Sequence, residues 1–410
     1  MTTSDIPVPP LKSVQAALCT TTEFLARELT SPTSEAPGWS AFEWRIARAV
    51  AALHGVSALL ANTLRWQGPE SWQRFLSDQR DHSVSRAQII SQLLLQIEVQ
   101  ARRVGIAMVA LKGAALNEIG VYGAGERPMG DVDLLVRAED MEATARALAA
   151  CDYAEWFTSR RHRIFEPRVT KATTWFGEHI DNSIKIEVHT RIAEPLPIVE
   201  TDITRQVFPQ PAHAGLNQYP SLASLMMHLL LHAAGNIRAR ALRLIQLHDV
   251  ALLAARMRPG DWEELLKAGA DDCGLWWALA PLALVARYYP AAIPQSVIAS
   301  LEPACPWLLG KVARRHQLAD VSWSNVRIQA FPGIEWSRSA REALAFAMSR
   351  VWPSRVALVE LQAATHNQPL ASMTPWYGIS HGARILRWIF SKPPRVQTLL
   401  AVRSALGFEP

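Results

Sequence analysis

The strongest constraint on the fold of this 410-residue chain comes from residues 111–136, which read LKGAALNEIGVYGAGERPMGDVDLLV. The apolar run IAMVAL at 106–111 lies between Gly105 and the Lys112-Gly113 pair, which is typical of a buried strand. After the Gly113 turn come a helix-like piece, a loop with three glycines and a proline, and an apolar strand at 131–136. This succession of strand, turn, helix, loop and strand predicts a mixed α and β core.

Two aspartates, Asp131 and Asp133, begin the strand at 131–136 and are separated only by Val132. In a strand, residues i and i+2 point to the same face, roughly 6.5–7 Å apart along it. Two carboxylates aimed at one point repel each other unless a cation lies between them. Hard divalent ions such as Mg²⁺ prefer carboxylate oxygens and keep positions open for phosphate oxygens. The pair therefore predicts a metal site, and the apolar residues around it distinguish it from the acids of a plain surface strand.

A third carboxylate, Glu187, lies in a second predicted strand at 183–191, SIKIEVHTR. The two faces of this strand alternate between apolar Ile184, Ile186 and Val188 and polar Lys185, Glu187 and His189. If this strand pairs near Asp131, three acids can hold two metal ions, one activating a hydroxyl and one gripping a triphosphate. The alternative for Glu187 is a solvated residue paired with Lys185 or Arg191.

Phosphate contacts are expected from the turn Lys112-Gly113-Ala114 and from Arg127. Glycine lets the backbone approach a ligand closely, amides at a helix N-terminus attract phosphate, and Lys112 adds a point charge. Arg127 lies four residues before Asp131 and carries a fork of donors. A common lysine-glycine turn and an ordinary loop arginine stay open as alternatives.

Helical patterns dominate the chain on both sides of this core. Residues 39–67 follow the helical period, with Ser40 and Glu43 spaced as a capping box, and a helix at 83–104 ends at Gly105. We therefore expect an α+β fold with a helical N-terminal region at 1–104, a core with a small mixed β-sheet at 105–215, and a helical C-terminal region at 216–410.

Several histidines and arginines outside the core have two interpretations. His54, His228 and His232 lie in apolar helical patterns and are interpreted as core histidines, although the i, i+4 spacing of the last two could bind a metal. Further polar residues form either a basic lip for a nucleotide or acceptor, or a solvated helix surface: Asn236, Arg238, Arg240 and Arg243.

Composition limits the class of protein. Hydrophobic residues make up 49% and charged residues 19%, which favours a globular chain, and a net charge of +5 does not identify a nucleic-acid binder. The four cysteines form no C-x-x-C pair, and the N-terminus lacks the pattern of a signal peptide. The most apolar run, at 275–285, is too short to span a membrane. We expect a reduced, cytoplasmic protein without a membrane span.

The combined motifs resemble the polymerase-β-type nucleotidyltransferase superfamily. More closely, LKGAALNEIGVY, ERPMGDVDLLV and IEVHTR resemble a mostly uncharacterised family of bacterial nucleotidyltransferases, over residues 105–191. The resemblance implies a nucleotidyltransferase core in which Asp131, Asp133 and Glu187 hold Mg²⁺ or Mn²⁺ and the turn at Gly113 holds a triphosphate. The superfamily usually has serine or a second glycine after the turn glycine, where this chain has Ala114, and the loop before Asp131 is longer than usual.

The function implied is metal-dependent transfer of a nucleoside monophosphate from an NTP to a hydroxyl acceptor, with release of pyrophosphate. Glu187 would help to remove the acceptor's proton. The acceptor stays open between a small molecule, a peptide or protein, and tRNA. Two alternatives remain: a catalytically inactive module that binds a nucleotide or peptide, and an antitoxin-type enzyme that modifies a protein or tRNA.

Overall fold

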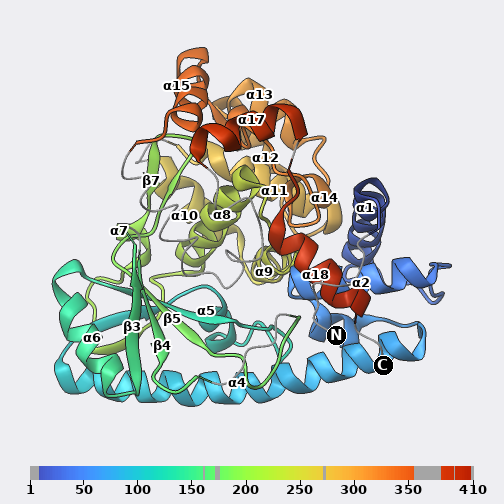
Figure 1. The fold of residues 1–410 in the computed structure, drawn as a ribbon. Coiled ribbons are helices and arrows are strands. Elements are labelled where there is room, and N and C mark those ends of the chain that lie inside the picture. Colours follow the sequence, from blue (N-terminus) through green and yellow to red (C-terminus); the bar gives the residue numbers. More distant parts are fainter. Residues whose placement is uncertain are drawn as a thin grey trace.

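A six-stranded mixed β-sheet lies at the centre of the fold (Figure 1). The structure is a computed structural model and describes residues 9–159, 162–170, 176–270, 274–354, 380–391 and 393–407. The strand order is β3-β4-β5-β2-β1-β8, with β2 parallel to β5 and antiparallel to β1. The strands are β1 (Ala107–Ala110), β2 (Asp131–Val136), β3 (Tyr153–Thr158), β4 (His162–Pro167), β5 (Lys185–His189) and β8 (Gly215–Asn217), and a separate ribbon pairs β6 (Ala193–Pro195) with β7 (Glu200–Asp202).

The two faces of β2 and β5 have different partners, as their alternating side chains require. Val132, Leu134, Ile186 and Val188 belong to an apolar cluster that includes residues of α4 (Glu70–Val104) and α6 (Met141–Ala149). On the opposite face, Leu135 belongs to a second cluster shared with the helical regions. Asp131 and Asp133 have the same parity as Leu135, so the carboxylates lie on the face of the sheet that looks toward the C-terminal helices.

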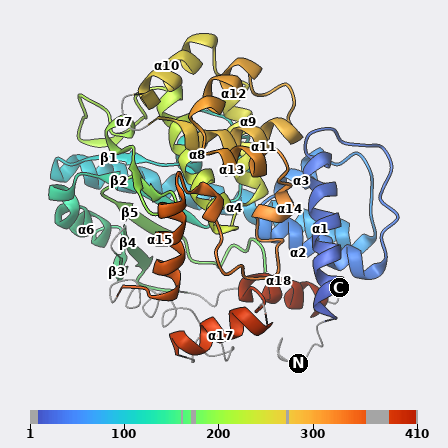
Figure 2. The same ribbon diagram turned by 90° about the horizontal axis from the view of Figure 1, so that it is seen from above.

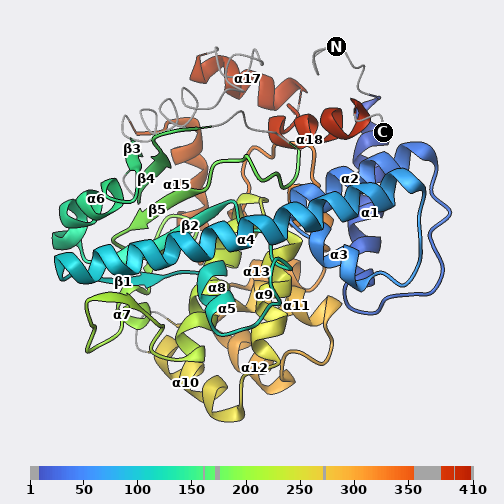
Figure 3. The same ribbon diagram turned by 90° about the horizontal axis from the view of Figure 1, so that it is seen from below.

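The helix α4 runs beneath the whole molecule, from the N-terminal helices to the sheet (Figure 3). Its predicted start at 83 was wrong, because the helix begins at Glu70. Three large side chains of the added turns are buried at helical spacing, namely Trp72, Phe75 and Leu76, and this packing stabilises the earlier start. Gly105 ends the helix with φ of 74°, in the left-handed conformation that glycine adopts readily.

The N-terminal helices are α1 (Leu11–Glu28), α2 (Ala41–His54) and α3 (Ser57–Thr63). The capping box of Ser40 and Glu43 is confirmed. The helical period of residues 39–67 is divided between two helices, because Gly55 adopts φ of 66° and ends α2. The helix α3 follows at an angle of 114° to α2.

The C-terminal helices stack above the sheet, and α18 packs against α2 (Figure 2). Arg45 and Arg48 of α2 donate to the carbonyl oxygens of Leu406 and Ala405 of α18. The remaining helices are α5 (Gly113–Glu118), α7 (Thr204–Val207), α8 (Leu222–Ala239), α9 (Leu244–Ala254), α10 (Pro259–Ala270), α11 (Leu279–Tyr288), α12 (Gln295–Leu301), α13 (Trp307–Ala313), α14 (Leu318–Val321), α15 (Ala340–Val351), α17 (His381–Ser391) and α18 (Val396–Gly407).

These elements confirm the predicted α+β class, with a mixed sheet flanked by helices. The division at 104 and 215 stays a prediction. Cys19, Cys151 and Cys305 carry free thiols, and Cys273 lies outside the described residues. Within the described ranges no single helix is long and apolar enough to span a membrane; α2 and α3 reach that length and composition only together, across their bend.

Candidate active site

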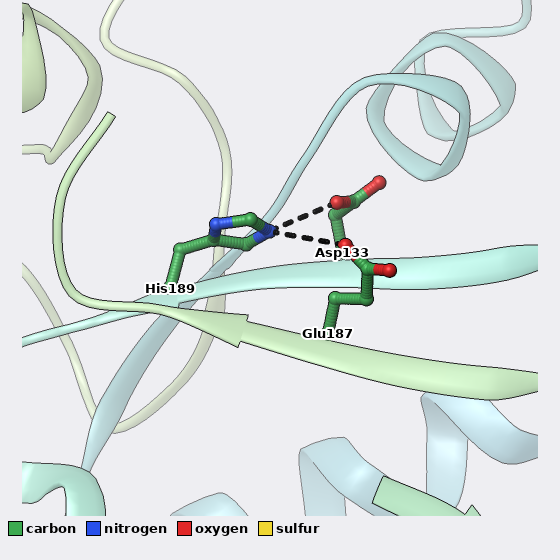
Figure 4. Close-up of side chains that lie close together, drawn as sticks. All are labelled: Asp133, Glu187 and His189. Atoms are coloured by element: carbon green, nitrogen blue, oxygen red, sulfur yellow. Dashed lines mark hydrogen bonds and ion pairs between the residues drawn. The ribbon is translucent and has the colours of Figure 1, made fainter. Parts of the chain in front are cut away.

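The register of β2 against β5 brings Asp133 and Glu187 together. The two residues are direct partners in this parallel pair, and His189 lies two residues beyond Glu187 on the same face. Asp133, Glu187 and His189 each offer one ligand atom, and these atoms all lie within 4.8 Å of one another (Figure 4). His189 Nε2 lies 3.0 Å from Asp133 Oδ1 and 3.8 Å from Glu187 Oε2. The three side chains therefore converge on one point above the sheet.

Asp131 lies on the same face of β2 but outside this converging group. Its backbone partner in β5 is Lys185, and the residue is exposed to solvent. Loss of solvation of the carboxylate, followed by repulsion from Asp133, raises the pKa of Asp131. The positive charges of Lys112, Arg243 and Arg127 oppose that rise. Asp131 is therefore an exposed acid at the edge of the site, within electrostatic reach of three cations.

Lys112 enters the site from the turn between β1 and α5. Its Nζ lies 2.8 Å from Asp133 Oδ1, the same oxygen that His189 contacts. Its backbone has φ of 50°, a conformation that costs a non-glycine residue about 1–3 kcal/mol and that is concentrated at functional sites. Burial lowers the pKa of Lys112, but Asp133 and Asp131 outweigh burial, so the net shift is upward and Lys112 carries its charge at neutral pH.

The carboxylates differ in how much their charge is compensated. Burial raises the pKa of Asp133, but Lys112 and His189 lower it more, so Asp133 is firmly ionised. Burial, followed by repulsion from Asp133 and Asp131, raises the pKa of Glu187 to about 7. The site therefore holds one strongly compensated acid and one acid whose charge lacks sufficient compensation from the protein.

The turn at Gly113 is packed against Arg127, the arginine expected to contact phosphate. A Cβ on Gly113 would lie 2.1 Å from Arg127 Nη1, so only glycine leaves room for the guanidinium. Arg127 Nε and Nη2 each lie 2.8 Å from an oxygen of Asp249, and Tyr122 Oη donates to the same carboxylate at 2.7 Å. This buried network joins the loop before β2 to α9. The role of Asp249 was not predicted from the sequence, because this residue lies far from Arg127 along the chain.

The amide of Ala114 already has a partner. Ala114 N donates to the carbonyl oxygen of Leu111 at 3.2 Å, and both Gly113 and Ala114 are buried. A phosphate at this amide would have to displace that bond. The structure thus gives the Lys112–Ala114 turn a packing role around Arg127, and its expected contact with phosphate stays a prediction.

A cavity of about 500 Å³ opens beside Glu187 and His189. Its other walls come from the turn at Lys112, from the chain after β5 and from α8, which contributes His228 and His232. Both were interpreted from the sequence as core histidines. His228 is buried as expected, yet both side chains line this cavity, which no local pattern indicates because the apolar residues around them form the rest of α8. By contrast, His54 is fully buried, with both ring nitrogens bonded, to Leu244 N and Ser324 Oγ.

The residues proposed as a basic lip are mostly engaged elsewhere. Arg240 forms a buried ion pair with Glu335 at 2.8 Å, Arg243 Nε donates to Leu53 O, and Asn236 contacts His232 in the same helix. Of these, Arg243 retains an electrostatic effect on Asp131. The lip stays an unsupported hypothesis.

The donor set suits a divalent cation. Carboxylate oxygens suit Mg²⁺ and Mn²⁺, whereas an imidazole suits Zn²⁺ and other transition metals. The raised pKa of Glu187 indicates that an added cation would relieve repulsion between carboxylates at this position. Asp133, Glu187 and His189 thus form a candidate metal site, and Asp131 is a further acid on the same face.

The sheet, the converging acids and the strand–turn–helix unit have the arrangement that was expected of a nucleotidyltransferase. A family model described as "Uncharacterised nucleotidyltransferase" matches residues 40–289, from the start of α2 to the end of α11. The chain belongs to this family. No curated protein and no solved structure matches the chain.

Proposed function

We propose that this protein is an active metal-dependent nucleotidyltransferase of the polymerase-β type, which moves a nucleoside monophosphate from an NTP to a hydroxyl acceptor and releases pyrophosphate. The convergence of Asp133, Glu187 and His189 beside an open cavity carries this proposal. Phosphoryl-type transfer needs positioning and charge neutralisation more than covalent chemistry from the protein. A cation between carboxylates and a cavity for a second reactant supply those two requirements.

In this proposal Asp133, Glu187 and His189 hold Mg²⁺ or Mn²⁺, and Asp131 adds a carboxylate toward the nucleotide. The bound cation would neutralise charge on the phosphates and polarise the bond that breaks. Lys112, which contacts Asp133, would exchange this contact for a phosphate oxygen when the nucleotide enters. Arg127, held in place by Asp249, would fix the turn beside that phosphate.

Glu187 is the proposed base that takes the acceptor's proton. A general base is most effective when its pKa lies near the working pH, and burial together with Asp133 and Asp131 raises the pKa of Glu187 to about 7. Glu187 also lines the cavity in which an acceptor would lie. That pKa describes the metal-free site, and a cation on Glu187 would lower it, so the position beside the cavity is what favours this role over a purely structural one.

The test is transfer of labelled NTP to a mixture of candidate acceptors with Mg²⁺ or Mn²⁺, together with release of labelled pyrophosphate. Asp133→Asn should abolish pyrophosphate release, because it removes the charge at the centre of the group. Asp81→Asn is a matched control, since Asp81 is a largely exposed acid on α4. Equal release by wild type and Asp133→Asn would overturn the proposal.

Two observations favour a second candidate, a nucleotide-binding module without catalysis. The ammonium of Lys112 contacts Asp133, and the Ala114 amide is bonded to Leu111, so two groups expected to serve the reaction are bonded within the protein. NTP binding measured by calorimetry, without pyrophosphate release under any metal, would favour this candidate.

A further inference from the structure

One wall of the cavity beside Glu187 contains His228, a histidine that can offer a hydrogen-bond donor to a ligand. His228 is only 3% exposed, yet it lines the cavity. Its Nδ1 lies 2.7 Å from Tyr219 Oη, and Tyr219 Oη accepts from Lys112 N at 3.4 Å. Tyr219 also carries a hydrogen that it can donate to His228 Nδ1, and in that tautomer the ring proton of the neutral histidine is on Nε2.

Nε2 of His228 is therefore the ring nitrogen left to face the cavity. Within the described part of the chain it has no hydrogen-bond partner, although the side chain is buried. A ligand oxygen in the cavity could accept a hydrogen bond from this nitrogen. His232, one turn further along α8, lines the same cavity, and Asn236 Nδ2 lies 3.2 Å from its Nε2. Burial lowers the pKa of both histidines, to about 3 for His228, so this wall is neutral.

The charged residues of the cavity favour a particular class of ligand. Its acids are Glu187, Glu194 and Glu200, and its cations are Lys112 and Arg191. Both cations already contact carboxylates, since Lys112 pairs with Asp133, and Arg191 lies 2.8 Å from Asp202 and 3.3 Å from Glu200. With His228 and His232 neutral, and with the pKa of Glu187 at about 7, the lining of the metal-free cavity is slightly net negative, which disfavours a phosphate chain.

Asp131 has more cations near it than the cavity does, although Lys112 also lines the cavity and Arg127 is paired with Asp249. Asp131 does not line the cavity and is within electrostatic reach of Lys112, Arg127 and Arg243. A triphosphate is attracted to that side, and an uncharged or cationic molecule is favoured in the cavity. The two reactants of a transfer would then meet at Asp133 and Glu187, which lie between the two sides.

We propose that the cavity is the acceptor site, and that it binds a small, neutral or positively charged hydroxyl compound, one of whose oxygens accepts from His228. This inference rests on the proposed function and narrows its acceptor, because it excludes tRNA and phosphorylated acceptors. Glu187 lines the cavity wall and therefore lies within reach of the acceptor hydroxyl. In the transfer, the hydroxyl oxygen would bond to the α-phosphorus, the bond from that phosphorus to pyrophosphate would break, and Glu187 would take the proton.

The charge of the cavity can be measured without knowing the acceptor. In Thr190→Cys a thiol replaces a half-buried side chain of the cavity wall. The reaction rates of this thiol with a cationic and an anionic methanethiosulfonate reagent are compared. Each rate is divided by the rate of the same reagent with free mercaptoethanol, and peptide mass spectrometry identifies which cysteine was labelled. We expect the cationic reagent to react about tenfold faster. Glu194→Gln in the same background should lower that ratio, and Ile198→Cys is a second labelling position if Thr190→Cys does not fold.

A second arm tests whether the cavity is separate from the nucleotide site. The cysteine variant is labelled with neutral benzyl methanethiosulfonate, and binding of trinitrophenyl-ATP with Mg²⁺ is measured before and after labelling. Nucleotide affinity should change less than about twofold. An anionic reagent that reacts as fast as the cationic one, or loss of nucleotide binding on labelling, would overturn the acceptor site. Failure of the unlabelled protein to bind nucleotide would instead overturn the proposed function, while the rate ratio would still report the charge of the cavity.

Discussion

Replacing Gly113 by alanine should disrupt the buried network beside the site, and the structure gives the size of the effect. The added Cβ would lie 2.1 Å from Arg127 Nη1, 2.7 Å from Arg127 Cζ and 2.8 Å from Met129 Sδ. The guanidinium cannot retreat, because its Nε and Nη2 are both held by Asp249 at 2.8 Å. Arg127 must therefore leave Asp249, which would leave a buried carboxylate without its cation.

Breaking a buried ion pair typically costs about 3–5 kcal/mol, so we expect Gly113→Ala to lower the free energy of unfolding by about 3 kcal/mol. The assay is urea unfolding followed by far-ultraviolet circular dichroism. Gly130→Ala is the matched control: Gly130 lies in the same loop, directly before Asp131, and no atom lies within 4 Å of its added Cβ. The control should stay within about 0.5 kcal/mol of wild type. Equal stabilities for the two variants would refute the packing role of Gly113.

Two further predictions concern buried polar groups. Burial, with a contribution from Arg243, lowers the pKa of His54 to about 3 from 6.5, so below pH 6.5 the unfolded chain binds more protons and stability falls with falling pH. At pH 5 the pKa difference between the folded and unfolded chain lowers the free energy of unfolding by about 2 kcal/mol. The variant His54→Asn keeps an acceptor for Leu244 N, so in urea unfolding it should lose about 2 kcal/mol less stability than wild type between pH 7 and pH 5. An equal loss in the two proteins would contradict this prediction. Asp249→Asn should lower the free energy of unfolding by about 3 kcal/mol, because it leaves Arg127 without its counter-charge. The double variant with Arg127→Met should recover part of this stability. Strictly additive losses of stability in the two single variants would count against the ion pair.

Local patterns in the sequence predicted most of the core elements. The strand with Asp131 and Asp133 begins and ends where expected, and the apolar run before Gly113 and the alternating segment around Glu187 both form strands. Alternation and glycine boundaries are local signals, so a single sequence contains them. They do not fix strand order, and β3, β4 and β8 were not predicted.

The composition of the candidate site depended on contacts that sequence periodicity does not encode. The parallel register of β2 with β5 joins residues 54 positions apart, because Asp133 pairs with Glu187. His189 lies on the predicted face, and its spacing from Glu187 was a usable signal for its place in the group. The pairing of Arg127 with Asp249 and the position of His228 depend on how α8 and α9 pack over the sheet.

The central claim is that Asp133, Glu187 and His189 bind a divalent cation together. It is tested most directly by titrating Mn²⁺ into the full-length protein, with and without a non-hydrolysable ATP analogue, and by measuring free Mn²⁺ by electron paramagnetic resonance. We expect wild type and Asp81→Asn to bind Mn²⁺ equally, Asp133→Asn to lose that binding, and the spectrum of bound Mn²⁺ to carry nitrogen coupling that His189→Gln removes. Mn²⁺ binding by Asp133→Asn equal to that of wild type would contradict the claim.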